Sequence, residues 1–121
     1  MKVCVSSQGS ALDNQVDPRF GRCAFFIFVD TESLEFEAIQ NPNIAAMGGA
    51  GVQSAQLVAE KGANFVITGN CGPNAYSILN AAGISVITGA SGSVKEVVEK
   101  VKTGQYESSS GPNVDSHFGM K

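Results

Sequence analysis

Residues 51–104 alternate between helical segments and short β-branched strands, and each helical segment ends at a glycine. Helices are predicted at 51–62, 73–83 and 93–104, and strands at 64–68 and 84–88. Pro73 suits the first position of its helix, and Ser93 with Glu96 forms a capping-box pattern. Helical crossovers make the strands that they join parallel, so this half of the chain predicts an α/β fold.

The first forty residues add three predicted strands, at 2–6, 23–30 and 34–40. The short turn at 31–33 makes the second and third strands a hairpin, and the alternation within 34–40 is typical of a strand at a sheet edge. The order is βββαβαβα. If the first strand pairs with both the hairpin and 64–68, a five-stranded mixed sheet results. The strand at 23–30 then runs against the others, and helices cover both faces.

Composition is that of one compact domain, with 43% apolar and 16% charged residues in 121. We expect a single α/β domain over 1–104 and a flexible tail over 105–121. The net charge of −3 gives no attraction to nucleic acid or to an anionic membrane. No apolar run approaches the roughly 20 residues of a membrane span. The three cysteines form no CxxC pair, which argues against a disulfide framework or a zinc ribbon and favours a reducing cytoplasm.

The predicted topology brings four loops, 7–22, 41–51, 69–73 and 89–92, to one edge of the sheet, where ligands bind in open α/β folds. The first loop contains DPRFGR (17–22), in which two arginines flank a phenylalanine that we expect to be exposed. The guanidinium groups of Arg19 and Arg22 suit a large, delocalised anion, because they donate forked hydrogen bonds. A solvated loop with ordinary surface charges is the alternative.

A glycine-rich run, 48–51, precedes the first predicted helix. Glycines let a ligand approach the backbone, and the N–H groups of a first helical turn favour an anion. The alternative is a plain loop that turns sharply into the helix. The run matches neither the Walker A loop nor GxGxxG, which argues against ATP and dinucleotide sites.

Cys71 lies two residues before the helix that begins at Pro73. A helix N-terminus is expected to lower the pKa of its thiol and make Cys71 a better metal ligand or nucleophile. The alternative is a small residue in a tight turn. Cys4 lies in the middle of a strand and is expected in the core, whereas Cys23 begins a strand near the arginines and is a second candidate.

A catalytic constellation is missing from the predicted domain, because the single histidine, His117, lies in the tail. We therefore expect a site that holds a ligand without transforming it. The segments VDPRFGR (16–22) and VDSHFGM (114–120) share V-D-x-x-F-G. The tail is thus a candidate lid, with His117 or Met120 as a soft metal ligand, and a chance match in an idle tail is the alternative.

The segments DPRFGR and GGAGVQSAQLVAEKGANFVITGNCGPNAYSILNAAGISV resemble the dinitrogenase iron–molybdenum cofactor biosynthesis family. The resemblance covers residues 1–104 and is most specific over 48–83. It implies a ribonuclease H-like α/β fold with a five-stranded mixed sheet. It does not imply nuclease activity, because the carboxylate cluster that would hold two metal ions is not evident in this sequence.

The family includes carriers and scaffolds for nitrogenase cofactor precursors, and a protein that holds a molybdenum–copper sulfide cluster. Such cargoes are large anions, which suit arginines and helix N-termini. The position of Cys71 is not reliably cysteine in the family, so a Cys–metal bond is left open. The site residues implied by motif position are Arg19, Phe20, Gly21, Arg22, Gly48, Gly49, Ala50, Gly51, Asn70, Cys71, Gly72, Pro73 and Asn74.

The leading functional hypothesis is a carrier or scaffold for an iron–sulfur or molybdenum-containing sulfide cluster, held as transient cargo and exchanged with cofactor-assembly proteins. The runner-up is an enzyme, either a Cys71-dependent transferase or a phosphate-ester hydrolase. A third hypothesis is a regulatory module whose sheet edge binds a small phosphate-bearing ligand.

Overall fold

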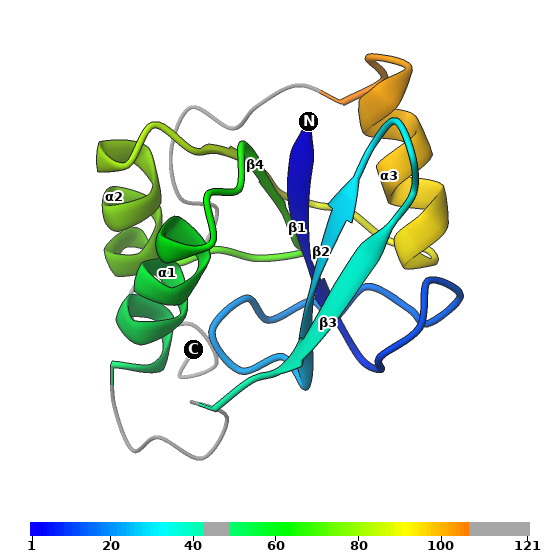
Figure 1. Ribbon diagram of the computed structural model, residues 1–121. Helices are drawn as coiled ribbons and strands as arrows, with labels where there is room; N and C mark the ends of the chain where they lie inside the picture. Colours follow the sequence, from blue (N-terminus) through cyan, green and yellow to red (C-terminus); the bar gives the residue numbers. More distant parts are fainter. Residues whose placement is uncertain (43–48, 107–121) are drawn as a thin grey trace.

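The computed structural model describes residues 1–42 and 49–106, which form one mixed sheet flanked by helices (Figure 1). The predicted order βββαβαβα is confirmed. The strands are β1 (Lys2–Ser7), β2 (Phe25–Asp30), β3 (Phe36–Gln40), β4 (Phe65–Ile67) and β5 (Ser85–Ile87), and the helices are α1 (Ala50–Glu60), α2 (Pro73–Ala81) and α3 (Val94–Lys102).

The sheet has the strand order β3-β2-β1-β4-β5. Strand β1 is parallel to β4, and β4 is parallel to β5. Strand β2 is antiparallel to both of its neighbours, β1 and β3. The mixed sheet, the reversed second strand and the edge position of β3 therefore agree with the sequence-based predictions.

Side chains of the central strand alternate between two hydrophobic clusters. Cys4 packs in the cluster that α1 and α2 cover, whereas Val3 and Val5 pack in the cluster that α3 covers. Figure 1 shows α1 and α2 on one side of the sheet and α3 on the other. This two-sided burial explains why the predicted buried strands are apolar nearly throughout.

The helix boundaries follow the predicted stop signals. Gly62, Gly83 and Gly104 all have positive φ angles, between 74° and 78°, as expected of glycines that end helices. The capping box at the start of α3 is present, with the Ser93 hydroxyl accepting the Glu96 N–H and the Glu96 carboxylate accepting the Ser93 N–H. Among the described helices, none has both the length and the apolar character needed to cross a bilayer.

The hairpin strands begin two residues later than predicted. Leu34 belongs to the turn rather than to β3, because it takes a left-handed conformation, with a φ of 62°, and its N–H donates to the Asp30 carbonyl at 2.8 Å. Cys23 precedes β2 because its carbonyl accepts a hydrogen bond from the Asn41 side chain at 2.9 Å. The side chain of Asn41 thus replaces a strand neighbour at this point.

Candidate functional site

The loops that follow β1, β4 and β5 are hydrogen-bonded to one another at the edge where these strands end, as predicted. The Val16 N–H donates to the Gly92 carbonyl at 2.9 Å, and the Gly89 N–H donates to the Gly69 carbonyl at 2.8 Å. This edge lies at the bottom of Figure 1. The segments 7–22, 69–73 and 89–92 therefore form one continuous surface. Of the fourth predicted loop, 41–51, residues 43–48 lie outside the described residues.

Buried hydrogen bonds hold the loop after β1 against the sheet. The Ser6 hydroxyl donates to the Asp17 carbonyl at 2.7 Å and lies 2.7 Å from the Thr68 hydroxyl of the neighbouring segment. The Asp17 N–H in turn donates to the Ser6 carbonyl at 2.8 Å. The arginine-bearing segment thus leaves the sheet from a fixed starting point.

Arg19 is the exposed cation of this loop, and a buried carboxylate lies next to it. The Arg19 side chain is 58% exposed, whereas that of Asp17 is 7% exposed. Asp17 Oδ1 accepts the Arg19 backbone N–H at 2.9 Å and lies 3.7 Å from Arg19 Nε. Arg22 is half-buried in the same loop. Both arginines lie in the loop at the edge of the sheet where β1 ends.

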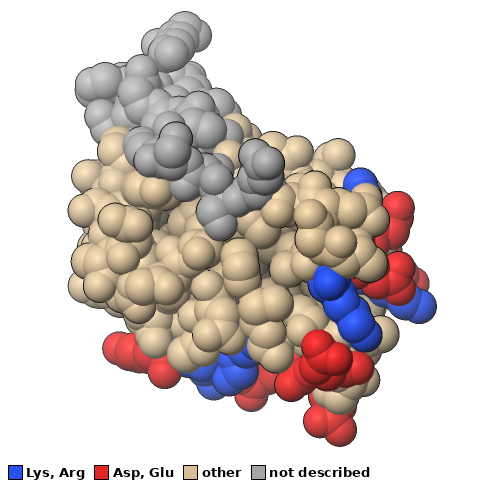
Figure 2. Space-filling model, turned by 90° about the horizontal axis from the view of Figure 1, so that it is seen from above, with Lys and Arg blue, Asp and Glu red and all other residues tan. Residues whose placement is uncertain are grey.

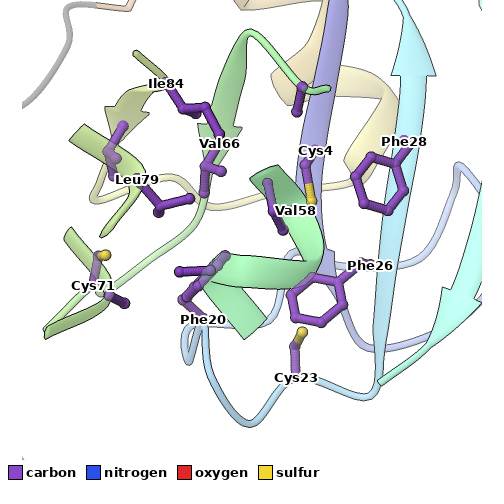
Figure 3. Packing of buried hydrophobic residues seen from close by; sticks show 14 residues of the cluster. Cys4, Phe20, Cys23, Phe26, Phe28, Val58, Val66, Cys71, Leu79 and Ile84 are labelled. Atoms are coloured by element: carbon purple, nitrogen blue, oxygen red, sulfur yellow. The ribbon is translucent and has the colours of Figure 1, made fainter. Parts of the chain in front are cut away.

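The expectation that Phe20 is exposed is wrong. Its side chain is 2% exposed and belongs to the cluster between the sheet and α1 and α2. The ring centroid lies 5.6 Å from that of Phe26 (Figure 3). Phe20 is therefore a hydrophobic anchor that faces inward from the segment between the two arginines, and its ring is not available to a ligand.

Gly21 packs directly on the first turn of α1. A Cβ atom at this position would lie 2.8 Å from the Gly51 nitrogen and 3.2 Å from the Ala50 carbonyl carbon. A Cβ atom on Gly51 would lie 3.5 Å from the Cβ of Ala75, in the first turn of α2. The arginine segment therefore packs on the first turn of α1, and this turn lies close to the first turn of α2.

The N-termini of α1 and α2 differ from that of α3. Gly49 and Gly72 are the N-cap residues of α1 and α2, neither makes a side-chain capping hydrogen bond, and neither first turn carries an acidic residue. Helix α3 instead has a capping box and Glu96 in its first turn. The partial positive charge of a helix N-terminus is thus opposed by local acidic groups in α3 but not in α1 or α2.

Cys71 is buried, and the expectation of a lowered thiol pKa is wrong. The residue is 1% exposed and packs with the cluster beneath α2 (Figure 3). Burial raises the pKa of its thiol from 9.0 to about 11. The cause is desolvation, because the thiolate would lose its hydration on burial. Cys71 is a neutral thiol near neutral pH, and its role as a metal ligand stays a prediction.

The other two cysteines are also buried thiols. Cys4 lies in the core, as predicted, and its pKa is raised well above the ordinary value by burial and by its neighbour Cys23. Burial, followed by the charge of Asp17, raises the pKa of Cys23 to about 12. In the described ranges, no group of three or more His, Cys, Asp or Glu side chains is arranged to hold a metal ion.

Asn41 and Asp17 were not predicted as site residues, but both contact the loop that carries the arginines. Asn41 is 2% exposed, and its side-chain nitrogen donates to the carbonyls of Gly21 and Cys23. Asp17 is the buried carboxylate beside Arg19. The Asp-Pro dipeptide is a turn signal that indicates a role for Asp17. Asn41 precedes Pro42, which is a turn signal of the same kind, but its hydrogen-bond partners are 18 and 20 residues away and have no local signal.

The remaining predicted site residues divide into two groups. Pro73 begins α2, and Asn74 is exposed in its first turn. Gly48, His117 and Met120 lie outside the described residues, as does most of the predicted tail. The predictions of a lid and of a soft ligand in the tail therefore stay predictions.

Figure 2 shows the opposite end of the molecule, where β1 begins. Lysine and arginine side chains alternate there with aspartate and glutamate along one margin, and most of the remaining coloured surface is uncharged. The described side chains in this view form no large patch of one sign.

Comparisons with known proteins agree with the sequence resemblance. The sequence model of the family described as "Dinitrogenase iron-molybdenum cofactor" matches residues 1–104. An uncharacterised protein of Methanocaldococcus jannaschii is 37% identical over 98 residues, which are 78% of this chain and 83% of that protein.

Solved structures match nearly the whole chain. The apo form of the orange protein from Desulfovibrio gigas is 37% identical, with a TM-score of 0.90, and the match covers 93% of this chain and 96% of that one. A Thermotoga protein solved as a candidate NifB protein is 36% identical, with a TM-score of 0.76, and the match covers 88% of this chain and 91% of that one.

Proposed function

This chain belongs to the dinitrogenase iron–molybdenum cofactor family, and we propose that it binds and carries an anionic metal–sulfur cluster or a precursor of an iron–molybdenum-type cofactor. The observation that carries the proposal is the contact between the arginine segment and the first turns of α1 and α2 at one sheet edge. The strand order β3-β2-β1-β4-β5, with β2 antiparallel to its neighbours, supports the ribonuclease H-like fold that the resemblance implies.

The donors at this edge suit a large anion with delocalised charge. Arg19 offers a guanidinium that is largely exposed, and guanidinium groups bind such anions through several weakly hydrated N–H donors. The first turns of α1 and α2 add backbone N–H groups and contain no acidic residue of their own. Sulfide-rich metal clusters are anions of this kind.

We propose that the cargo is held by ion pairs and hydrogen bonds and not by a resident thiolate. A metal-bound cysteine must lose its proton, and burial works against that step by raising the pKa of the Cys71 thiol to about 11. A carrier has to release its cargo, and non-covalent contacts suit that exchange. Cofactor-assembly proteins are the proposed donors and acceptors of the cluster.

The similarity to the orange protein supports the proposal. It is 37% identical and was solved as an apo form, a term that distinguishes a protein from its ligand-bound state. The family description names an iron–molybdenum cofactor. Both descriptions belong to those proteins and that family, and they favour a cofactor-related ligand for this chain.

A phosphate-bearing ligand is the second candidate, because the same arginines and helix N-termini suit phosphate. An enzyme with Cys71 as nucleophile is disfavoured by the raised pKa of its buried thiol. We propose that the protein acts by binding and not by catalysis. Turnover that disappears in Cys71→Ser would contradict this proposal.

The test is metal and sulfide analysis, with a visible spectrum, on protein purified without oxygen. We expect a stoichiometric cluster after purification or after anaerobic reconstitution with metal and sulfide. Colourless, metal-free protein after both procedures would contradict the proposal. A rise in melting temperature with a phosphate-bearing ligand alone would then favour the second candidate.

A further inference from the structure

The backbone around Arg19 is held from both sides by Asn70. The Asn70 side-chain nitrogen donates to the Pro18 carbonyl at 3.0 Å, and the Asn70 carbonyl accepts the Phe20 N–H at 3.3 Å. Arg19 and Asn70 also form a parallel β-bridge, to which the hydrogen bond from the Phe20 N–H to the Asn70 carbonyl belongs. The residue before Arg19 and the residue after it are therefore fixed to the loop that precedes α2.

The backbone around Arg22 is held in the same way by Asn41. The Asn41 side-chain nitrogen donates to the Gly21 carbonyl at 3.1 Å and to the Cys23 carbonyl at 2.9 Å. The Gly21 carbonyl also accepts the Ser54 hydroxyl of α1 at 3.3 Å. The residues on either side of Arg22 are thus fixed to the end of β3 and to α1.

We infer that Asn41 and Asn70 are positioning residues for the anion site, each acting through the one arginine that its hydrogen bonds enclose. This inference rests on the proposed function. It also changes the role expected for Asn70, whose amide faces the protein backbone as a clamp. Asn41 is buried and acts on the ligand only through Arg22.

The hydrogen bonds of Asn41 and Asn70 hold the backbone of the arginine segment in place before a ligand binds. Phe20, which lies between the two arginines in sequence, is buried in the core and anchors the segment there. Ordering a loop on binding reduces affinity, so a loop that is already ordered binds more tightly. The side chain of Arg19 stays exposed while its backbone is fixed, which is the combination that a reusable anion site requires.

The test is a set of double-mutant cycles on the full chain, with tetrathiomolybdate as the anionic probe. We expect Asn41→Ala to weaken binding of the probe by about threefold to tenfold. The loss should vanish in the Arg22→Ala background and persist in the Arg19→Ala background. Asn70→Ala should show the reverse pattern, with its loss abolished by Arg19→Ala.

Equal losses in both arginine backgrounds would overturn the inference, because a general loss of stability affects both arginines alike. Ser54→Ala provides a milder variant if Asn41→Ala does not fold, since it removes only the weaker hydrogen bond to the Gly21 carbonyl. Its smaller loss should again depend on Arg22 alone.

A second measurement tests the inference without any ligand. Backbone nitrogen-15 relaxation should show lower order parameters at Arg22 and Cys23 in Asn41→Ala, with Arg19 unchanged. In Asn70→Ala, which removes the side-chain hydrogen bond to the Pro18 carbonyl but keeps the Asn70 carbonyl, Arg19 should lose order instead. Unchanged order in both variants would overturn the inference. If the wild-type chain binds no tetrathiomolybdate, the proposed function fails, and relaxation alone decides whether the clamps exist.

Discussion

Gly21 lies so close to Gly51 that no side chain fits between them: a Cβ atom on Gly21 would lie 2.8 Å from the Gly51 nitrogen and 2.9 Å from its Cα. Both of these neighbours are backbone atoms at the start of α1, so neither can rotate away. This contact joins the arginine segment to the α1 N-terminus. The geometry of the candidate site depends on it.

Gly21→Ala is therefore expected to push the arginine segment away from α1. Overpacking against backbone atoms costs about 1 to 3 kcal/mol, and the free energy of unfolding should fall by that amount in urea titration. Affinity for an anionic probe should fall as well, because Arg19 and Arg22 flank the displaced residue.

Gly51→Ala is the matched control. Its Cβ would lie 3.5 Å from the Cβ of Ala75, which is an ordinary contact, and alanine is favoured over glycine within a helix by about 0.5 to 1 kcal/mol. We expect unchanged or increased stability. Equal destabilisation by the two substitutions would contradict the close packing of Gly21.

Asp17→Asn should strengthen anion binding. Asp17 places a negative charge 3.7 Å from Arg19 Nε, and this charge opposes an incoming anion. Asparagine keeps an oxygen that can accept the Arg19 N–H, so the local turn should survive. We expect roughly twofold to tenfold tighter binding at low salt, measured by titration at two ionic strengths.

Asp13→Asn makes the same charge change at an exposed position of the same loop. Its effect should be smaller at low salt and should disappear at high salt, because exposed charges are screened. Equal effects of the two substitutions would mean that only net charge matters. The carboxylate beside Arg19 would then have no specific role.

Cys71 should make the protein less stable in alkaline solution. The folded thiol has a pKa of about 11, against an ordinary value of 9.0. Between these values the unfolded chain releases a proton that the folded chain keeps, so the free energy of unfolding falls as pH rises. Below pH 9 the contribution of this thiol is fully present.

The measurement compares the wild-type chain with Cys71→Ala in denaturant at pH 8 to 11. Cys4 and Cys23 are present in both proteins, so their contributions cancel in the difference. The stability advantage of the wild-type chain should be constant up to about pH 9 and shrink from there to pH 11. A constant difference would show that the Cys71 thiol is not buried as the structure has it.

Local signals were sufficient to predict the element order and the topology of the sheet. Gly62, Gly83 and Gly104 end their helices with the expected left-handed conformation, and Ser93 with Glu96 caps α3. These are short-range interactions, which a sequence displays directly. The parallel arrangement then followed from the helical crossovers.

Burial within loops could not be predicted in the same way. Phe20 lies in a polar loop sequence but reaches the ring of Phe26 in the core. Cys71 precedes a helix as expected, but its burial, which raises the thiol pKa, was not predicted. Asn41 acts on residues far away in sequence. Each of these properties arises from tertiary packing, which neither composition nor periodicity contains.

The most direct test of the central claim is the affinity of tetrathiomolybdate, measured without oxygen, for the wild-type chain and for the Arg19→Ala/Arg22→Ala variant. Lys102→Ala, at the far end of α3, serves as the control that removes a positive charge elsewhere. The account predicts saturable binding to the wild-type and Lys102→Ala chains, with a loss of at least about tenfold in the double arginine variant. Absence of binding to the wild-type chain, or equal affinity in all three proteins, would contradict it.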